Sequence, residues 1–206
     1  MRQNKRSPKD NSIKKIMILG TEPGVGVTHF SILLASYYVF TLGKKVCIVD
    51  LSDTDDYLCM DRIYHGDDTF DTSDYIYPIK KIDFLVSSEK PDRSELIKTA
   101  LAHNHDIIIF DNGTNSDHIE KDMVMCDTKY IIGNCSLWKV LGFEKQITRL
   151  PNIHAYRYLF AFGQIENTDI LRQKYGIKIR QIPYTDSPFR IGKKQLSELE
   201  KIIWEE

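Results

Sequence analysis

The chain has 206 residues, a net charge of −1 and 28% charged side chains, so neither sign dominates. This balance argues against a specific nucleic-acid partner, which would require a clustered basic surface. No stretch is apolar over the length of a membrane span, and the polar, basic start does not resemble a secretory leader. The four cysteines lack C-x-x-C spacing, which favours a reducing compartment. We therefore expect a cytoplasmic protein with a disordered basic tail over residues 1–12 and a single domain over residues 13–206.

The first part of the domain predicts a compact β-α-β unit. A strand is expected over residues 15–20, a glycine-rich turn follows, and a helix is expected over residues 28–42. That helix is apolar on nearly every face, which is typical of a buried helix. The next strand, over residues 45–51, is a continuous apolar run and includes Cys47, as expected for a parallel strand covered on both faces.

Strands and helices continue to alternate to the end of the chain. The remaining expected elements are a short helix at 57–64, one or two strands at 76–88 with Pro78 at an edge or turn, a helix at 91–102, a strand at 106–111, a helix at 116–126, a strand at 129–133, a helix ending near 149, a strand at 156–162, a helix at 168–175 with Thr168 as its N-cap, a strand at 177–184 and a helix at 192–204. This alternation predicts an α/β fold: a doubly wound, mostly parallel sheet with helices on both faces. Ligands then bind at the carboxyl ends of the strands.

The turn between the first strand and the first helix has the composition of a phosphate cradle. It reads Gly20-Thr-Glu-Pro-Gly-Val-Gly26 and leads into the helix. Glycines let backbone N–H groups approach an anion, and the helix N-terminus adds about half a positive charge. The residues expected to line a phosphate site here are Gly20, Gly24, Val25, Gly26, Val27, Thr28 and His29.

This turn resembles the deviant P-loop of the ParA/MinD family of ATPases, whose motif is K-G-G-V-G-K-T-T. The matching positions are Gly24, Val25, Gly26 and Thr28. Glu22 stands at the signature lysine, Pro23 at the first glycine, Val27 at the second lysine and His29 at the last threonine. The resemblance implies ATP or ADP with Mg²⁺ as ligand. It also implies a metal-binding role for the hydroxyl of Thr28.

Three further segments resemble the same family. The strand ending at Asp111 is similar to a Walker B strand, which makes Asp111 a metal-site and catalytic residue. Asp50 ends its strand where relatives carry D-x-D, and it is the second catalytic candidate, although Asp53 comes one place late. Residues 182–189 resemble the I-P-x-x-x-x-P-F turn of the CpaE-type pilus-assembly subgroup, and Pro183 would lie against adenine.

Both P-loop lysines are replaced, and this favours a degenerate member of the family. A hydrogen bond to a charged group contributes about 1.5–3 kcal/mol, so losing one weakens nucleotide binding by roughly 10- to 150-fold. Glu22 would repel the nucleotide that the family's lysine contacts in a partner subunit. We therefore expect a regulatory or positioning module with weak or absent nucleotide hydrolysis. It would act through a protein partner, such as a secretion or pilus-type assembly, or as a homodimer. The acidic end Trp204-Glu-Glu argues against autonomous membrane binding.

Two other functions compete with this interpretation. The chain would be an active ATPase if other basic groups, such as Arg190 or Lys193, replaced the missing lysines against the loop. Gly20, Gly24 and Gly26 are also similar to the cofactor loop of short-chain dehydrogenases, in which Asp50 would hold the ribose of NAD. That family needs a Y-x-x-x-K pair on a helix, and the pair found here begins at Tyr77, close to Pro78.

Trp138 is expected as a core or groove-filling aromatic, with a partner surface as the alternative.

Overall fold

A computed structural model describes residues 12–66, 74–87, 92–117 and 119–205. The expected basic tail lies outside these residues except for Ser12. Within them, eight strands form one sheet in the order β3-β4-β2-β5-β1-β6-β7-β8. The strands are β1 (Lys14–Gly20), β2 (Val46–Asp50), β3 (Asp74–Ile79), β4 (Ile82–Ser87), β5 (Ile107–Asp111), β6 (Thr128–Cys135), β7 (Arg157–Gly163) and β8 (Ile179–Gln181). Neighbouring strands are parallel except for the β3–β4 hairpin.

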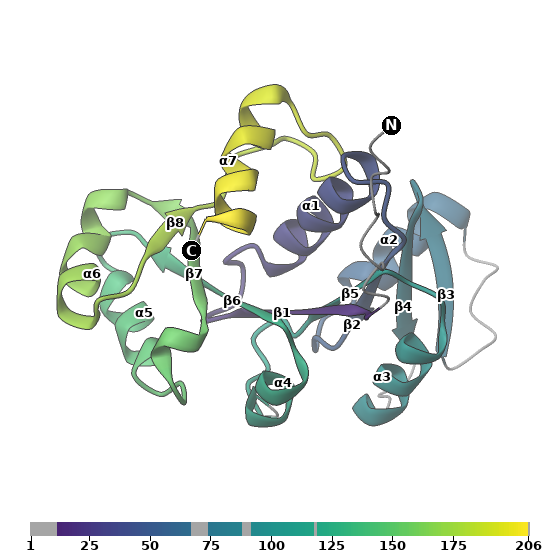
Figure 1. Cartoon of the computed structure of the whole chain (residues 1–206), viewed down its shortest axis with the longest axis horizontal. Helices are drawn as coiled ribbons and strands as arrows, with labels where there is room; N and C mark the ends of the chain where they lie inside the picture. The colour runs from purple at the N-terminus through teal and green to yellow at the C-terminus, as the bar shows by residue number, and fades with distance from the viewer. Residues whose placement is uncertain (1–11, 67–73, 88–91, 118, 206) are drawn as a thin grey trace, which may run out of the picture.

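Helices cover both faces of the sheet (Figure 1). The helices are α1 (Val27–Phe40), α2 (Asp56–His65), α3 (Arg93–Ala102), α4 (Ile119–Met125), α5 (Val140–Ile147), α6 (Asp169–Tyr175) and α7 (Lys193–Trp204). Helices α1, α2 and α7 share one apolar core with the sheet, and α3, α4, α5 and α6 share the core on its other face. The predicted doubly wound α/β fold is confirmed. No helix among the described residues has the length and apolarity to span a membrane.

Some local predictions are confirmed by the structure and others are wrong. Pro78 does lie in an edge strand, β3, as expected. At the other edge only Ile179–Gln181 form β8, although the apolar pattern predicted a strand over 177–184. Thr168 precedes α6 as expected, but its hydroxyl donates backward to the carbonyl of Ile165 at 2.6 Å and does not cap the helix.

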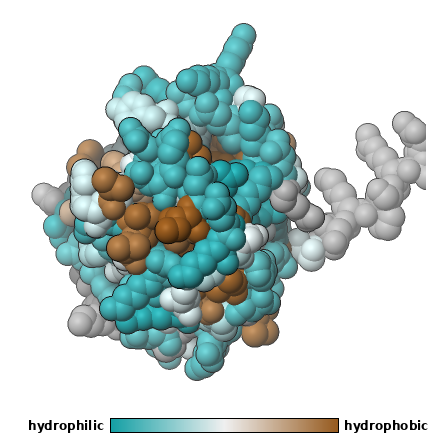
Figure 2. Space-filling model, turned by 90° about the vertical axis from the view of Figure 1, so that its left-hand side faces the viewer, coloured by the Kyte–Doolittle hydropathy of each residue, from teal (hydrophilic) through white to brown (hydrophobic). Residues whose placement is uncertain are grey.

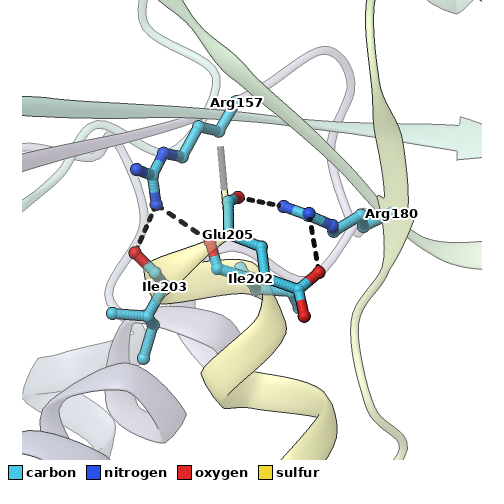
Figure 3. A network of polar contacts seen from close by, with 5 residues as sticks. All are labelled: Arg157, Arg180, Ile202, Ile203 and Glu205. Carbon is cyan, nitrogen blue, oxygen red and sulfur yellow. Dashed lines mark hydrogen bonds and ion pairs between the residues drawn. The ribbon is translucent and has the colours of Figure 1, made fainter.

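The C-terminal end of α7 is held by two arginines from the sheet (Figure 3). Nη1 of Arg157 donates to the carbonyls of Ile202 and Ile203 at 2.9 and 2.6 Å. Arg180 donates to the carbonyl of Glu205 at 2.7 Å and to its carboxylate at 3.2 Å. The last carbonyls of a helix have no partner within it, so these bonds supply the partners and attach α7 to β7 and β8.

Candidate functional site

The glycine-rich loop has a backbone that few other residues could adopt. Gly24 and Gly26 have φ values of +78° and +98°, in the left-handed region that favours glycine. At Gly20 space is the limit, because a Cβ there would lie 2.7 Å from the side chain of Val27. The loop is fastened to its neighbours by bonds from the N–H of Gly20 to Gly113 at 2.7 Å and from the N–H of Thr21 to Ile132 at 2.9 Å. The loop and the start of α1 therefore form a preorganised turn at the carboxyl end of β1.

The position of the P-loop lysine is apolar and closed. Val27, the first residue of α1, is 7% exposed and packs in the core. The cradle can offer backbone N–H groups and the α1 N-terminus to an anion, but no charged side chain from this position. His29, at the position of the last threonine, is half-buried, and desolvation lowers its pKa, so burial favours its neutral form.

Asp50 and Asp111 each end a strand, as predicted, and the structure shows that these strands are neighbours with the two residues paired in register. Asp111 is fully buried, and both of its carboxylate oxygens accept hydrogen bonds. Tyr57 donates to Oδ2 at 2.6 Å, and the N–H of Gly113 donates to Oδ1 at 2.9 Å. Burial raises the pKa of Asp111, while these hydrogen bonds lower it, and burial is the larger effect.

Burial also perturbs the carboxyl of Asp50. Desolvation raises the pKa of Asp50 to about 7, against hydrogen bonds from Ser52 that lower it. These bonds run from the hydroxyl and the N–H of Ser52 to Oδ1, at 2.6 and 3.0 Å. The charges of Asp111 and Asp56 add to the increase. Near neutral pH this carboxyl can exchange a proton.

The start of α2 reaches the site, and the sequence interpretation missed it. Thr28 donates its hydroxyl to Asp56 at 3.4 Å, and Thr54 donates to the same oxygen at 3.2 Å. The sequence pattern gave Asp56 no role in the site, and Asp53, the acid considered for the D-x-D role, is exposed. Since Tyr57 donates to Asp111, the first turn of α2 contacts both side chains predicted to bind metal. Among the described residues no three His, Cys, Asp or Glu side chains are grouped to hold a metal ion.

The negative charge of the acid in the loop is paired with a lysine of the same chain. Glu22 forms an ion pair with Lys139, with 2.8 Å between Nζ and Oε2. Asn134 donates to the other oxygen of Glu22 at 3.2 Å. A register shift between Gly133 and Asn134 marks a bulge at the end of β6, and bulges commonly redirect a side chain. Lys139 gave no signal in the sequence because 117 residues separate it from Glu22.

The other predicted groups differ in exposure. Pro183 is buried just after β8. Arg190 and Lys193 are exposed, so the burial that would favour the active-ATPase alternative is not observed. Tyr77 lies in β3 and Lys81 in the turn that follows, so the dehydrogenase-like pair is not on a helix.

Exposed apolar side chains gather at the carboxyl ends of β6 and β7, beside the loop. They are Leu137, Trp138, Leu141, Phe162, Ile165 and Ile170, which we call the apolar patch. Trp138 is 81% exposed, so the expected core role is wrong. The elements carrying them are in contact: Asn167 donates to the carbonyl of Cys135, and Lys174 of α6 pairs with Glu144 of α5 at 2.9 Å. Figure 2, viewed from the side of α5, α6 and β8, shows apolar side chains gathered on this face.

No protein-family model and no curated protein sequence matches the chain. Solved structures match over most of its length. A plasmid partition protein of Borrelia burgdorferi bound to AMPPNP is 16% identical, with 93% of this chain and 97% of that chain covered and a TM-score of 0.60. MinD in the MinC:MinD cell division complex of Aquifex aeolicus is 16% identical, with 84% and 82% covered and a TM-score of 0.54. FtsY of Mycoplasma mycoides is 14% identical, with 94% and 69% covered and a TM-score of 0.60. These identities show the fold alone, an α/β fold shared with P-loop NTPase structures that include the ParA/MinD class.

Proposed function

We propose that the chain is a degenerate ParA/MinD-like P-loop protein that acts as a regulatory or positioning module through a protein partner. Its nucleotide hydrolysis is weak or absent. The observation that carries this proposal is the charge arrangement of the loop. The two lysine positions hold a buried valine and a glutamate paired with Lys139. The cradle therefore keeps its backbone geometry without the cations that stabilise transferring phosphates.

The acidic side of the site supports the same proposal. Both oxygens of Asp111 are engaged by Tyr57 and Gly113, and the hydroxyl of Thr28 points to Asp56. Mg²⁺ prefers oxygen ligands in near-ideal octahedral geometry. A Mg²⁺ ion at Thr28 and Asp111 would compete with Tyr57 of α2 for the Oδ2 atom of Asp111. ATP or ADP with Mg²⁺ would bind through Gly20–His29, with Pro183 as the proposed adenine contact, but weakly.

Isothermal titration with ATP and ADP, with and without Mg²⁺, tests the nucleotide part of this proposal. A phosphate-release assay at millimolar ATP accompanies it. We expect dissociation constants weaker than micromolar and no phosphate release above that of the buffer. Micromolar, Mg²⁺-dependent binding with turnover would instead identify an active ATPase and overturn the proposal.

The apolar patch supports the partner-binding part. Contiguous exposed apolar surface of a few hundred Å² or more commonly marks a protein interface, and exposed tryptophan is enriched in such interfaces. The patch begins in the β6–α5 loop, which also carries Lys139, so a partner bound there would contact the site. The MinD of the matched complex assembles with MinC. By analogy, we propose a protein partner here, such as a component of a secretion or pilus-type assembly.

Photocrosslinking in cells of the native host, from a photoreactive residue at Leu141, tests the patch. The crosslinked band is compared in the wild-type background and with Trp138→Asp. Val124→Asp is the matched control, because Val124 is 88% exposed on α4, an element without patch residues. We expect a discrete band that Trp138→Asp removes and Val124→Asp leaves. A band unaffected by Trp138→Asp, or the absence of any band, would contradict a partner at this surface.

A further inference from the structure

We propose that Lys139 is the phosphate-binding cation of the loop and that Glu22 holds it inactive in an internal ion pair. This inference rests on the proposed phosphate site at residues 20–29. It adds a regulatory feature, because the state of one ion pair sets the affinity of the loop for anions. It also replaces Arg190 and Lys193 as the expected substitutes for the missing lysines.

The position of Lys139 supports this role. Lys139 precedes α5 and is fixed by its N–H bond to the carbonyl of Ser136 at 2.8 Å, while its ammonium group reaches Glu22 in the loop. Its side chain is 46% exposed, so it retains freedom to turn. Lysine carries a compact charge on a flexible stem and is a common phosphate ligand.

The carboxylate of Glu22 is held by two donors from outside the loop. Both of its oxygens accept hydrogen bonds, one from Lys139 and one from Asn134. It lies two residues before Gly24, at the entrance of the cradle. A phosphate group that approaches the loop therefore meets a negative charge and a lysine that is already paired. Removing the charge of Glu22 would free Lys139 and leave Asn134 as an additional donor.

A double-mutant cycle with Glu22→Gln and Lys139→Met tests this inference. The probes are ATP with Mg²⁺ and inorganic tripolyphosphate, titrated calorimetrically at low salt. We expect Glu22→Gln to strengthen binding about fivefold or more, because a hydrogen bond from a charged group replaces an internal pair. Lys139→Met should cancel that gain in the Glu22→Gln background and change the wild-type affinity by less than about twofold. Both probes should respond alike, because Lys139 would contact phosphate and not adenine.

Glu144→Gln is the matched control. It breaks a similar ion pair, with Lys174 at 2.9 Å, between α5 and α6 and away from the loop, so the affinity should not change. Urea unfolding of every variant checks that it is folded.

Two outcomes would overturn the inference. If Lys139→Met weakens binding by the same factor in both backgrounds, Lys139 acts only through the general electrostatic field. If Glu22→Gln binds neither probe at millimolar concentration, Lys139 is not a phosphate ligand. The second outcome leaves the proposed partner-binding module standing, because crosslinking of the wild-type chain tests that module independently.

Discussion

Asp50 is a partly buried acid whose ionisation opposes folding. Desolvation raises its pKa to about 7 in the folded protein, whereas an aspartate in an unfolded chain has a pKa of about 3.9. Between these two values the folded state binds the proton more tightly than the unfolded chain does. The unfolding free energy contributed by Asp50 is therefore highest below about pH 4, falls as the pH rises to about 7, and then stays constant.

Asp50→Asn should remove this pH dependence. The amide oxygen can still accept the bonds from Ser52, and no charge has to be buried. We expect the variant to unfold with a free energy close to that of the wild type at pH 4 and higher at pH 8, by at most about 4 kcal/mol. Urea unfolding at several pH values measures this difference. Asp53→Asn, at an exposed position, is the control for loss of charge alone. If the difference in unfolding free energy between Asp50→Asn and the wild type does not change with pH, the pKa of Asp50 is not raised by folding.

At the scale of secondary-structure elements, the close contact between the ends of β6 and β7 requires a glycine at position 163. Gly163 ends β7 with a φ of +109°, and a Cβ there would lie 2.0 Å from the carbonyl carbon of Cys135. The two backbones are therefore in direct contact beside the apolar patch. In α5, by contrast, a Cβ on Gly142 would meet nothing within 4 Å.

Gly163→Ala and Gly142→Ala should consequently shift stability in opposite directions. We expect the first to lower the unfolding free energy by more than about 2 kcal/mol, through backbone strain and the clash with Cys135. The second should raise it by about 0.5–1 kcal/mol, because alanine favours a helix more than glycine does. Denaturant unfolding of both variants measures the effect. If both substitutions change the unfolding free energy equally, the ends of β6 and β7 can move apart without a cost in free energy.

At the scale of the whole molecule, the sheet is most deeply buried at its centre. β1 and β5 are neighbours in the strand order, their apolar residues from Ile16 to Leu19 and from Ile107 to Phe110 are buried, and helices cover both faces. β8 is three residues long and pairs with β7 alone. Arg180 of β8 donates to the carbonyl of Glu205 just after α7, and this bond attaches β8 to that helix.

Amide hydrogen exchange should follow this gradient. Residues Ile16–Leu19 and Ile107–Phe110 should open only by global unfolding, whereas Ile179–Gln181 should exchange about a hundredfold faster or more by local opening. Mass spectrometry of peptides from β1, β5 and β8 measures the rates, with β6 as the internal reference. Equal protection of β8 and β1 would show that α7 and the sheet unfold as one unit.

Much of the fold follows from local patterns that the sequence displays by itself. Continuous apolar runs indicate buried parallel strands, Pro78 lies in an edge strand, and the glycines at positions 20–26 form the expected turn because only glycine readily adopts its backbone. The positions of Asp50 and Asp111 at strand ends were also predicted from the sequence, whereas the pairing of these two strands was not.

The contacts that define the candidate site were decided by the tertiary structure. Tyr57 and Asp111 are 54 residues apart, and Glu22 and Lys139 are 117 apart. Hydrophobic periodicity depends on near neighbours in the chain and carries no information about which polar groups meet at strand ends. The exposure of Trp138 has the same origin, because burial of a single aromatic depends on what the rest of the chain packs against it. The sequence by itself therefore determined the architecture and the loop, and only the folded chain decided which charges lie against that loop.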